Sequence, residues 1–180
     1  SAHGVAENQP AKLAAMEGHY EAKAPADMYV LGWVDESNEK VYGIKIPNGL
    51  SFLVDFDFNS EITGLNAFPE DEIPTQVNAV FQFYHLMVAI GILLIALTLY
   101  ATFLRFRGEL FTKKWLMTIF VFSVLLPQIA NQVGWFAAEM GRQPWVVYGL
   151  LRTSDAFSKS VSANQVLSSL IMFFVIYTIL

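Results

Sequence analysis

Cysteine is absent from this sequence of 180 residues, and its absence excludes three kinds of chemistry. Without thiols the chain forms no disulfide, holds no iron–sulfur cluster and offers no thiolate ligand to haem. Positive charge is also scarce, because 11 Lys and Arg are outnumbered by 16 Asp and Glu, for a net charge of −5. We therefore expect no nucleic-acid partner, since the basic patch that binds one is missing.

Formal charge is missing from three long stretches, bounded by Glu72–Arg105, Lys114–Glu139 and Lys159–Leu180. Each has room for the roughly 20 residues that cross a bilayer. We expect an all-α transmembrane helical bundle with three membrane helices, joined to a small mixed α/β loop domain. The chain has no initiator Met and no signal peptide, and it stops inside an apolar run, so we interpret it as a fragment of a longer membrane protein.

The acidic front of the chain, residues 1–76, is predicted to be the loop domain. Residues 1–10 are expected to be structureless and residues 11–22 to form a short helix. Alternation of apolar residues predicts strands at Met28–Val34 and Val41–Pro47, with the turn DESNEK between them. Leu50–Phe56 is expected to be a third stretch with β character, followed by a loop.

The remaining segments are expected to alternate between membrane and water. They are a transmembrane helix at 77–104, a cytoplasmic turn at 105–114, a second helix at 115–139 broken at Pro127, a loop at 140–162 and a truncated helix at 163–180. Four basic residues lie between Arg105 and Lys114, and the positive-inside rule places this turn in the cytoplasm. Residues 1–76 and 140–162 then share the opposite side.

The stretch GWFAAEMGRQPW, Gly134–Trp145, brings two charges to the end of the second uncharged run. Glu139 and Arg142 are costly to desolvate beside hydrocarbon, so such residues normally have partners or a function. One interpretation is an interfacial ion pair that ends the helix within a belt of Trp side chains. The other is a binding site for a large, flat, apolar cofactor.

These twelve residues closely resemble the signature of subunit I of cytochrome bd quinol oxidase, the haem-bearing subunit of a bacterial terminal oxidase. Three other segments are similar to the same family: VFQFYHLMVAIG, AKLAAMEGHYE and APADMYVLGWVDESNEKVYGIKIP. The resemblance covers nearly the whole chain, as the C-terminal portion of subunit I. The short segment between Asp55 and the first long helix indicates a short-loop variant.

The resemblance places Met87 on the methionine ligand of the family's low-spin haem b. A thioether is a soft ligand that raises the potential of haem iron, although a Met in an apolar helix is usually a packing residue. His85 stands where familiar members have an arginine. We expect it to be a hydrogen-bonding or propionate-binding residue, or part of the core. Residues two apart on a helix point about 200° apart, so His85 and Met87 cannot share one iron.

The resemblance also makes Glu139 the carboxylate ligand of the high-spin haem b, and a hard anionic ligand suits ferric iron. Trp135 lies one helical turn earlier on the same face, where the family has a tryptophan among its haems; its alternative role is a membrane-belt anchor. Arg142 is expected to bind a haem propionate, since guanidinium matches carboxylate bidentately. The third haem of the family is haem d or a further haem b.

Lys12 and Glu17 fall on the two functional positions of the family's quinol-binding loop. Quinol oxidation releases protons, so a carboxylate near the quinol hydroxyl can act as the base. The alternative is a solvated helix that carries a surface ion pair. The resemblance thus predicts that Lys12 and Glu17 are the catalytic residues of quinol oxidation.

The sequence therefore predicts part of a quinol:oxygen oxidoreductase of the bacterial inner membrane, which contributes to proton motive force in aerobic respiration. Its expected partners are subunit II, a small accessory subunit, membrane lipid, quinol and oxygen, and the chain is not expected to be active alone. The rival hypothesis is a non-enzymatic membrane anchor or transporter fragment, in which the pair Glu139–Arg142 is purely structural.

Overall fold

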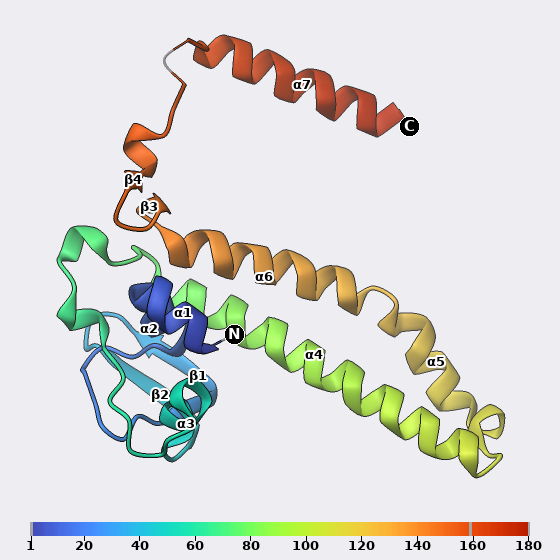
Figure 1. Cartoon of the computed structure of the whole chain (residues 1–180). Helices are drawn as coiled ribbons and strands as arrows, with labels where there is room; N and C mark the ends of the chain where they lie inside the picture. The colour runs from blue at the N-terminus through green and yellow to red at the C-terminus, as the bar shows by residue number, and fades with distance from the viewer. Residues whose placement is uncertain (1, 159, 180) are drawn as a thin grey trace.

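The computed structural model describes residues 2–158 and 160–179, and it shows a long helical hairpin with a small domain at one end (Figure 1). The helices are α1 (Ala2–Asn8), α2 (Pro10–Glu17), α3 (Gly49–Asp55), α4 (Val77–Phe106), α5 (Lys114–Ser123), α6 (Leu126–Arg142) and α7 (Ala163–Ile179). The strands are β1 (Met28–Asp35), β2 (Lys40–Ile46), β3 (Trp145–Val147) and β4 (Leu151–Arg152). Short 3₁₀ helices lie at Leu65–Ala67, Glu70–Glu72, Leu110–Thr112 and Thr153–Asp155.

Helices α4 and α6 lie side by side and form the body of the molecule (Figure 1). They belong to two stretches that are long and apolar enough to cross a membrane, Glu70–Phe106 and Lys114–Arg142. The predicted break in the second stretch is present, since α5 ends at Ser123 and α6 begins at Leu126. Pro127 explains the break, because its ring removes a helical hydrogen bond and clashes with the preceding turn.

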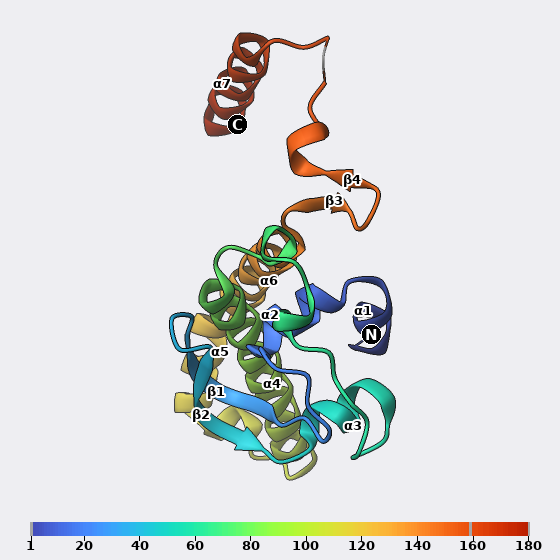
Figure 2. The same cartoon turned by 90° about the vertical axis from the view of Figure 1, so that its left-hand side faces the viewer.

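Helix α7 corresponds to the third predicted span, but it has only 17 residues and none of them is buried. Figures 1 and 2 both show it apart from the helical hairpin. A bilayer span needs roughly 20 residues. By length, the described part of the chain therefore contains two membrane-capable helices, and the predicted count of three is not confirmed.

Two predictions for the small domain are wrong. Residues 1–10 were expected to be structureless, but Ala2–Asn8 is helix α1. Leu50–Phe56 was expected to have β character, but it lies mostly within helix α3. Leu50 and Val54 are spaced one helical turn apart and are both buried in the same cluster, and such burial needs a helical period.

The predicted β-hairpin is present, and β1 pairs with β2 in antiparallel register. The other edge of β1 faces α4, whose first turns carry polar side chains in an otherwise apolar helix. Hydrogen bonds join Asn78 Oδ1 to the Val34 N–H (3.1 Å), Gln82 Nε2 to the Gly32 carbonyl (2.7 Å) and His85 Nε2 to the Tyr29 carbonyl (2.8 Å). These side chains satisfy backbone groups that an edge strand would leave unpaired.

Helix α2 lies across the ends of α4 and α6, and a buried cluster joins the three. Phe81 of α4 and Ala137 of α6 contribute to this cluster together with Ala15 of α2. Gly18 ends α2 with a φ of +64°, so the helix is shorter than the predicted range of residues 11–22. A side chain there would also meet Val41 at 2.6 Å, so glycine lets the hairpin pack closely over the helix end.

We predict that Gln82→Leu loosens β1, because the Gly32 carbonyl then has no side-chain donor. An unpaired buried acceptor costs about 1–3 kcal/mol, and we expect the lower end of this range because the Gln82–Gly32 bond is only partly buried. Hydrogen–deuterium exchange of the full-length protein should show faster exchange across residues 28–35.

The control is Thr98→Val on the same helix, since the Thr98 hydroxyl bonds only to carbonyls of its own helix. It should leave exchange in β1 unchanged. Equal exchange in the wild type and in Gln82→Leu would show that this contact does not hold the strand.

Candidate functional site

A surface hollow of about 360 Å³ opens between α4 and α6, and it brings three predicted residues together. Met87 of α4 lines it with Trp135 and Glu139 of α6. The helices approach closely here because residue 134 is glycine, where a Cβ would lie 2.6 Å from the Met87 Sδ. The rest of the lining is small or polar, namely Ala130, Asn131 and Ala138. A thioether and a carboxylate thus face the same open space.

Glu139 and Arg142 form an ion pair at the last turn of α6. Both side chains are about one-third exposed, so the pair lies at the surface. Lys12 of α2 lies close by, because a Cβ at Gly141 would be 3.2 Å from the Lys12 Cγ. Burial and the Arg142 charge lower the pKa of Lys12, while Glu139 acts in the opposite direction. Lys12 therefore belongs to the Glu139–Arg142 corner.

This corner also holds two buried nitrogen atoms, Arg142 Nε and Trp145 Nε1, with no hydrogen-bond partner among the described residues. Arg152 supports the corner from outside, since its guanidinium lies 4.9 Å from the Trp145 ring centroid and 2.8 Å from the Asp71 carboxylate. Arg152 was not predicted, because no local motif distinguishes it. Two unpaired N–H donors, one of them on the positively charged Arg142, suit an anionic group such as a carboxylate.

These features fit haem, which membership of a cytochrome family would imply. Met87 and Glu139 each offer one iron ligand in an open hollow lined mainly by small residues, and the orphaned donors of Arg142 and Trp145 suit propionates. No group of three or more His, Cys, Asp or Glu that could hold a metal ion occurs within the described residues. Haem would not require such a cluster, because the porphyrin itself would supply most of the iron ligands and Met87 and Glu139 would each add one.

Glu17 lies at the other end of α2 and is only 2% exposed. Burial raises its pKa to about 7, and a hydrogen bond with the Tyr84 side chain lowers it in part. The Glu17 Oε2 atom has no hydrogen-bond partner among the residues that the structure describes. A carboxyl group that titrates near neutral pH can exchange protons readily there. Tyr84 was not predicted, because only the folded chain brings it to Glu17.

Glu17 borders an apolar groove of about 570 Å³ between the β-hairpin and α4. The α4 side of the groove is formed by Tyr84, His85, Val88, Ala89, Ile92, Leu93 and Ala96, and the hairpin side by Met28, Tyr29, Val30, Leu31 and Ile46. Lys12 is not part of this lining. The structure therefore separates Lys12 and Glu17, which the resemblance had assigned to one site.

His85 is buried, and each of its two ring nitrogens lies within hydrogen-bond distance of a backbone carbonyl. Its Nδ1 lies 2.8 Å from the Phe81 carbonyl and its Nε2 lies 2.8 Å from the Tyr29 carbonyl. The ring also stacks on Phe81, with centroids 3.9 Å apart. His85 is thus a hydrogen-bonding residue between α4 and β1; its binding of a propionate stays a prediction.

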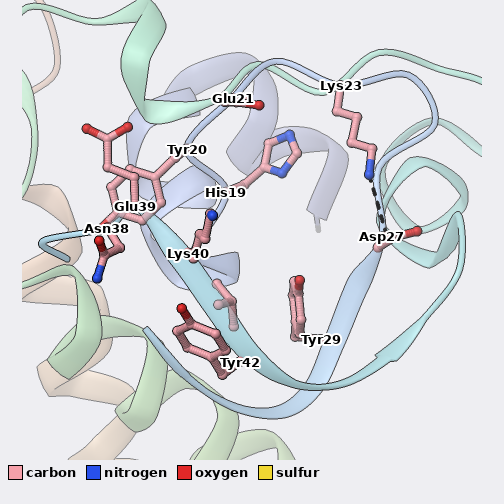
Figure 3. Close-up of a pocket in the computed structure, with 12 residues that line it drawn as sticks. His19, Tyr20, Glu21, Lys23, Asp27, Tyr29, Asn38, Glu39, Lys40 and Tyr42 are labelled. Atoms are coloured by element: carbon pink, nitrogen blue, oxygen red, sulfur yellow. Dashed lines mark ion pairs between the residues drawn. The ribbon is translucent and has the colours of Figure 1, made fainter. Parts of the chain in front are cut away.

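A further hollow, of about 430 Å³, lies between β2 and the segment after α2 (Figure 3). It is lined by charged and polar side chains, including the ion pair of Lys23 and Asp27, whose nitrogen and oxygen lie 3.7 Å apart. None of the predicted site residues lines it. We therefore do not assign the function to this hollow.

Comparison with known proteins shows matches along the chain. The family described as "Cytochrome bd terminal oxidase subunit I" matches residues 1–180. The chain is 35% identical to the cytochrome bd ubiquinol oxidase subunit 1 of Bacillus subtilis strain 168, with 99% of the chain and 40% of the relative covered. It is 38% identical to a putative cytochrome bd menaquinol oxidase subunit I of the same strain, with 90% and 37% covered.

A solved structure is also similar, that of the bd oxidase from Geobacillus thermodenitrificans. Its TM-score is 0.78 at 33% sequence identity, and the match covers 99% of this chain and 40% of that chain. The chain thus spans about 40% of the length of these relatives.

We predict that Glu17 makes stability depend on pH. The folded-state pKa is about 7 against an ordinary value of 4.5, so between these values the unfolded chain loses a proton that the folded chain keeps. Stability should fall by about 3 kcal/mol as pH rises through this range, since a tenfold change in proton affinity corresponds to about 1.4 kcal/mol.

Glu17→Gln should remove this slope, which thermal unfolding of the full-length protein at several pH values can measure. The exposed Glu21→Gln is the control and should keep the slope. A slope that persists in Glu17→Gln would contradict the assignment.

Proposed function

The chain belongs to the cytochrome bd terminal oxidase subunit I family, and from this premise we propose that it is part of a haem-bearing subunit that oxidises quinol and reduces oxygen to water. The observation that carries the proposal is the common hollow of Met87, Trp135 and Glu139. It joins a soft and a hard iron ligand on two adjacent membrane-capable helices.

In this proposal Met87 supplies the thioether ligand of a low-spin haem b and Glu139 the carboxylate ligand of a high-spin haem b. Arg142 would hold a propionate through its guanidinium, and Trp135, which lines the same hollow as Met87 and Glu139, would lie among the cofactors. Bound haem would supply the iron that accepts electrons from quinol. The second ligand of the low-spin haem, and the site of the third haem, which is haem d or haem b, belong to other parts of the subunit.

The quinol site is proposed to be the apolar groove that ends at Glu17. A quinol is a flat ring with a long apolar tail, and the groove offers mostly apolar walls with the carboxyl group of Glu17 among its lining residues. Glu17 accepts a proton from the quinol hydroxyl, and Tyr84 orients the carboxylate through their hydrogen bond. Lys12 acts from the neighbouring corner, where its charge lies beside Glu139 and Arg142.

The proposal also places the chain in the bacterial inner membrane. The basic turn between α4 and α5 lies in the cytoplasm by the positive-inside rule, so α2 and the Glu139–Arg142 corner lie on the periplasmic side. Protons from quinol then leave on that side, which contributes to proton motive force. Subunit II and a small accessory subunit are the proposed partners.

The second candidate is a membrane anchor without enzymatic activity. Its specific support is the Glu139–Arg142 ion pair, which forms from the chain's own side chains alone. In that case the pair ends α6 at the membrane surface and binds nothing else.

Variants of Met87 and Glu139 separate these candidates, and each serves as the control for the other. Met87→Leu keeps the apolar volume but removes the sulfur, so it should abolish the low-spin haem b signal and leave the high-spin signal. Glu139→Ala should abolish the high-spin haem b signal and leave the low-spin signal. Glu139→Gln should leave the high-spin haem site partly occupied.

Reduced-minus-oxidised spectra and haem extraction of the full-length oxidase measure both changes. If the Met87 and Glu139 variants retain both signals and full oxygen reduction, these residues are not the iron ligands and the ion pair is structural. If the wild-type protein itself has no haem signal and reduces no oxygen, the second candidate holds.

The quinol step is tested by Glu17→Gln, which keeps the size of the side chain and removes the base. Quinol oxidation should fall roughly 100-fold or more, the range expected for loss of a positioned base, with all haem bands retained. Lys12→Leu should cause a smaller decrease, because Lys12 does not line the groove.

Lys23→Leu, an exposed change on the same loop, is the matched control and should have normal turnover. Normal turnover in Glu17→Gln, or loss of haem from it, would contradict the assignment of the base.

A further inference from the structure

One face of the β-hairpin is apolar and exposed. In the observed register Leu31 lies opposite Ile44 and Trp33 lies opposite Tyr42, and residues opposite each other share one face of a sheet. Leu31 is 57% exposed, Trp33 61% and Ile44 68%. Such a cluster of large apolar side chains usually marks an interaction surface.

The opposite face of the same hairpin is the one that packs on the molecule. Val34 is buried in the main cluster and Val41 packs against it. Lys45 also points to this second face, where it pairs with Asp27 at 2.6 Å. The exposed apolar face is therefore additional to the core of the small domain.

The position of the hairpin along α4 gives its depth in a membrane. β1 is bonded to α4 at His85, then Gln82, then Asn78. At about 1.5 Å per residue these positions lie about 30, 35 and 40 Å from Arg105, the first basic residue of the turn. A bilayer has roughly 30 Å of hydrocarbon and 40–45 Å in all, with its headgroups. If Arg105 lies at the inner edge of the hydrocarbon, the hairpin begins at the outer edge. It then crosses the headgroup layer, which is about 5–8 Å thick on each side, and ends in the water beyond.

The residues on the exposed face follow the polarity of the bilayer in the same order. The paired positions, from the deepest outward, are Met28 and Ile46, Leu31 and Ile44, Trp33 and Tyr42, and Asp35 and Lys40. Aliphatic pairs come first, an aromatic pair lies at headgroup level and charges lie beyond it. Trp and Tyr are enriched at this level in membrane proteins. A protein neighbour would not require this order.

Helix α3 extends the apolar face at its deep end. Gly49, its first residue, lies against Met28 and Ile46, with a Cβ position only 3.0 Å from the Met28 Cβ. Both views show α3 beside the hairpin (Figures 1 and 2). Phe52 of this helix and Phe56, which directly follows it, are exposed, the latter at 80%.

We propose that this face of the β-hairpin, with α3, lies in the lipid leaflet at the N-terminal end of α4. The hairpin is then a membrane-interface element rather than a water-exposed loop, and the groove beside it opens toward lipid. The proposal requires that α4 crosses a membrane, but it does not depend on the quinol chemistry of Glu17.

Spin labels on the full-length oxidase in lipid nanodiscs test this. The variant Ile44→Cys, in a background without other reactive cysteines, carries the label on the apolar face. Ser37→Cys in the charged turn of the same hairpin is the matched control. The accessibility of each label is measured with oxygen, which concentrates in hydrocarbon, and with a water-soluble nickel chelate. Normal haem spectra establish that both variants are folded.

The label at position 44 should be mobile, and its ratio of oxygen to nickel accessibility should be several-fold higher than that at position 37. Equal ratios would show that the face is in water. An immobilised label at position 44, shielded from both reagents, would show that a protein segment covers the face. Either result overturns the proposal.

Discussion

The close contact between α4 and α6 is the constraint on which the rest of the structure depends. Glycines at positions 134 and 141 of α6 permit it, since a Cβ at Gly134 would meet Met87 and a Cβ at Gly141 would meet both Val80 and Lys12. The first glycine brings the thioether to the helix that carries Glu139. The second lets α2 lie across the helix ends. Lys12 then lies beside Gly141 of α6, and Glu17 borders the groove between the β-hairpin and α4.

The polar side chains within the first turns of α4 impose a second structural constraint. In a membrane helix such residues are costly unless they have partners, and here β1 supplies the partners. The result is a β-strand fixed along the membrane helix, with an apolar groove between them. The buried carboxyl of Glu17 lies at the end of that groove, where burial raises its pKa to about 7. Helix α2 and the β-hairpin therefore both contribute to the buried core and form the groove that Glu17 borders.

Much of the fold could be predicted from the sequence, and the errors in that prediction have physical causes. The long apolar runs and the alternating strands carry strong periodic signals, and the break at Pro127 follows from the ring itself. Helices α1 and α3 were missed because helices of one or two turns are stabilised by the contacts that bury them rather than by local propensity.

The site residues Met87, Trp135 and Glu139 were predicted from the family motif, and the structure brings them to one hollow. Lys12 and Glu17 line different hollows, which agrees with their spacing, since residues five apart on a helix point about 140° apart. Tyr84 and Arg152 were missed because their roles arise only from contacts between distant segments.

The central claim is that α4 and α6 carry the iron ligands of a haem oxidase, and an optical spectrum of the purified full-length protein tests it most directly. The account predicts a strong Soret band and b-type bands that appear when dithionite is added, with haem recovered on extraction. A protein that is folded in the membrane but shows no Soret band and no dithionite-induced change would contradict it.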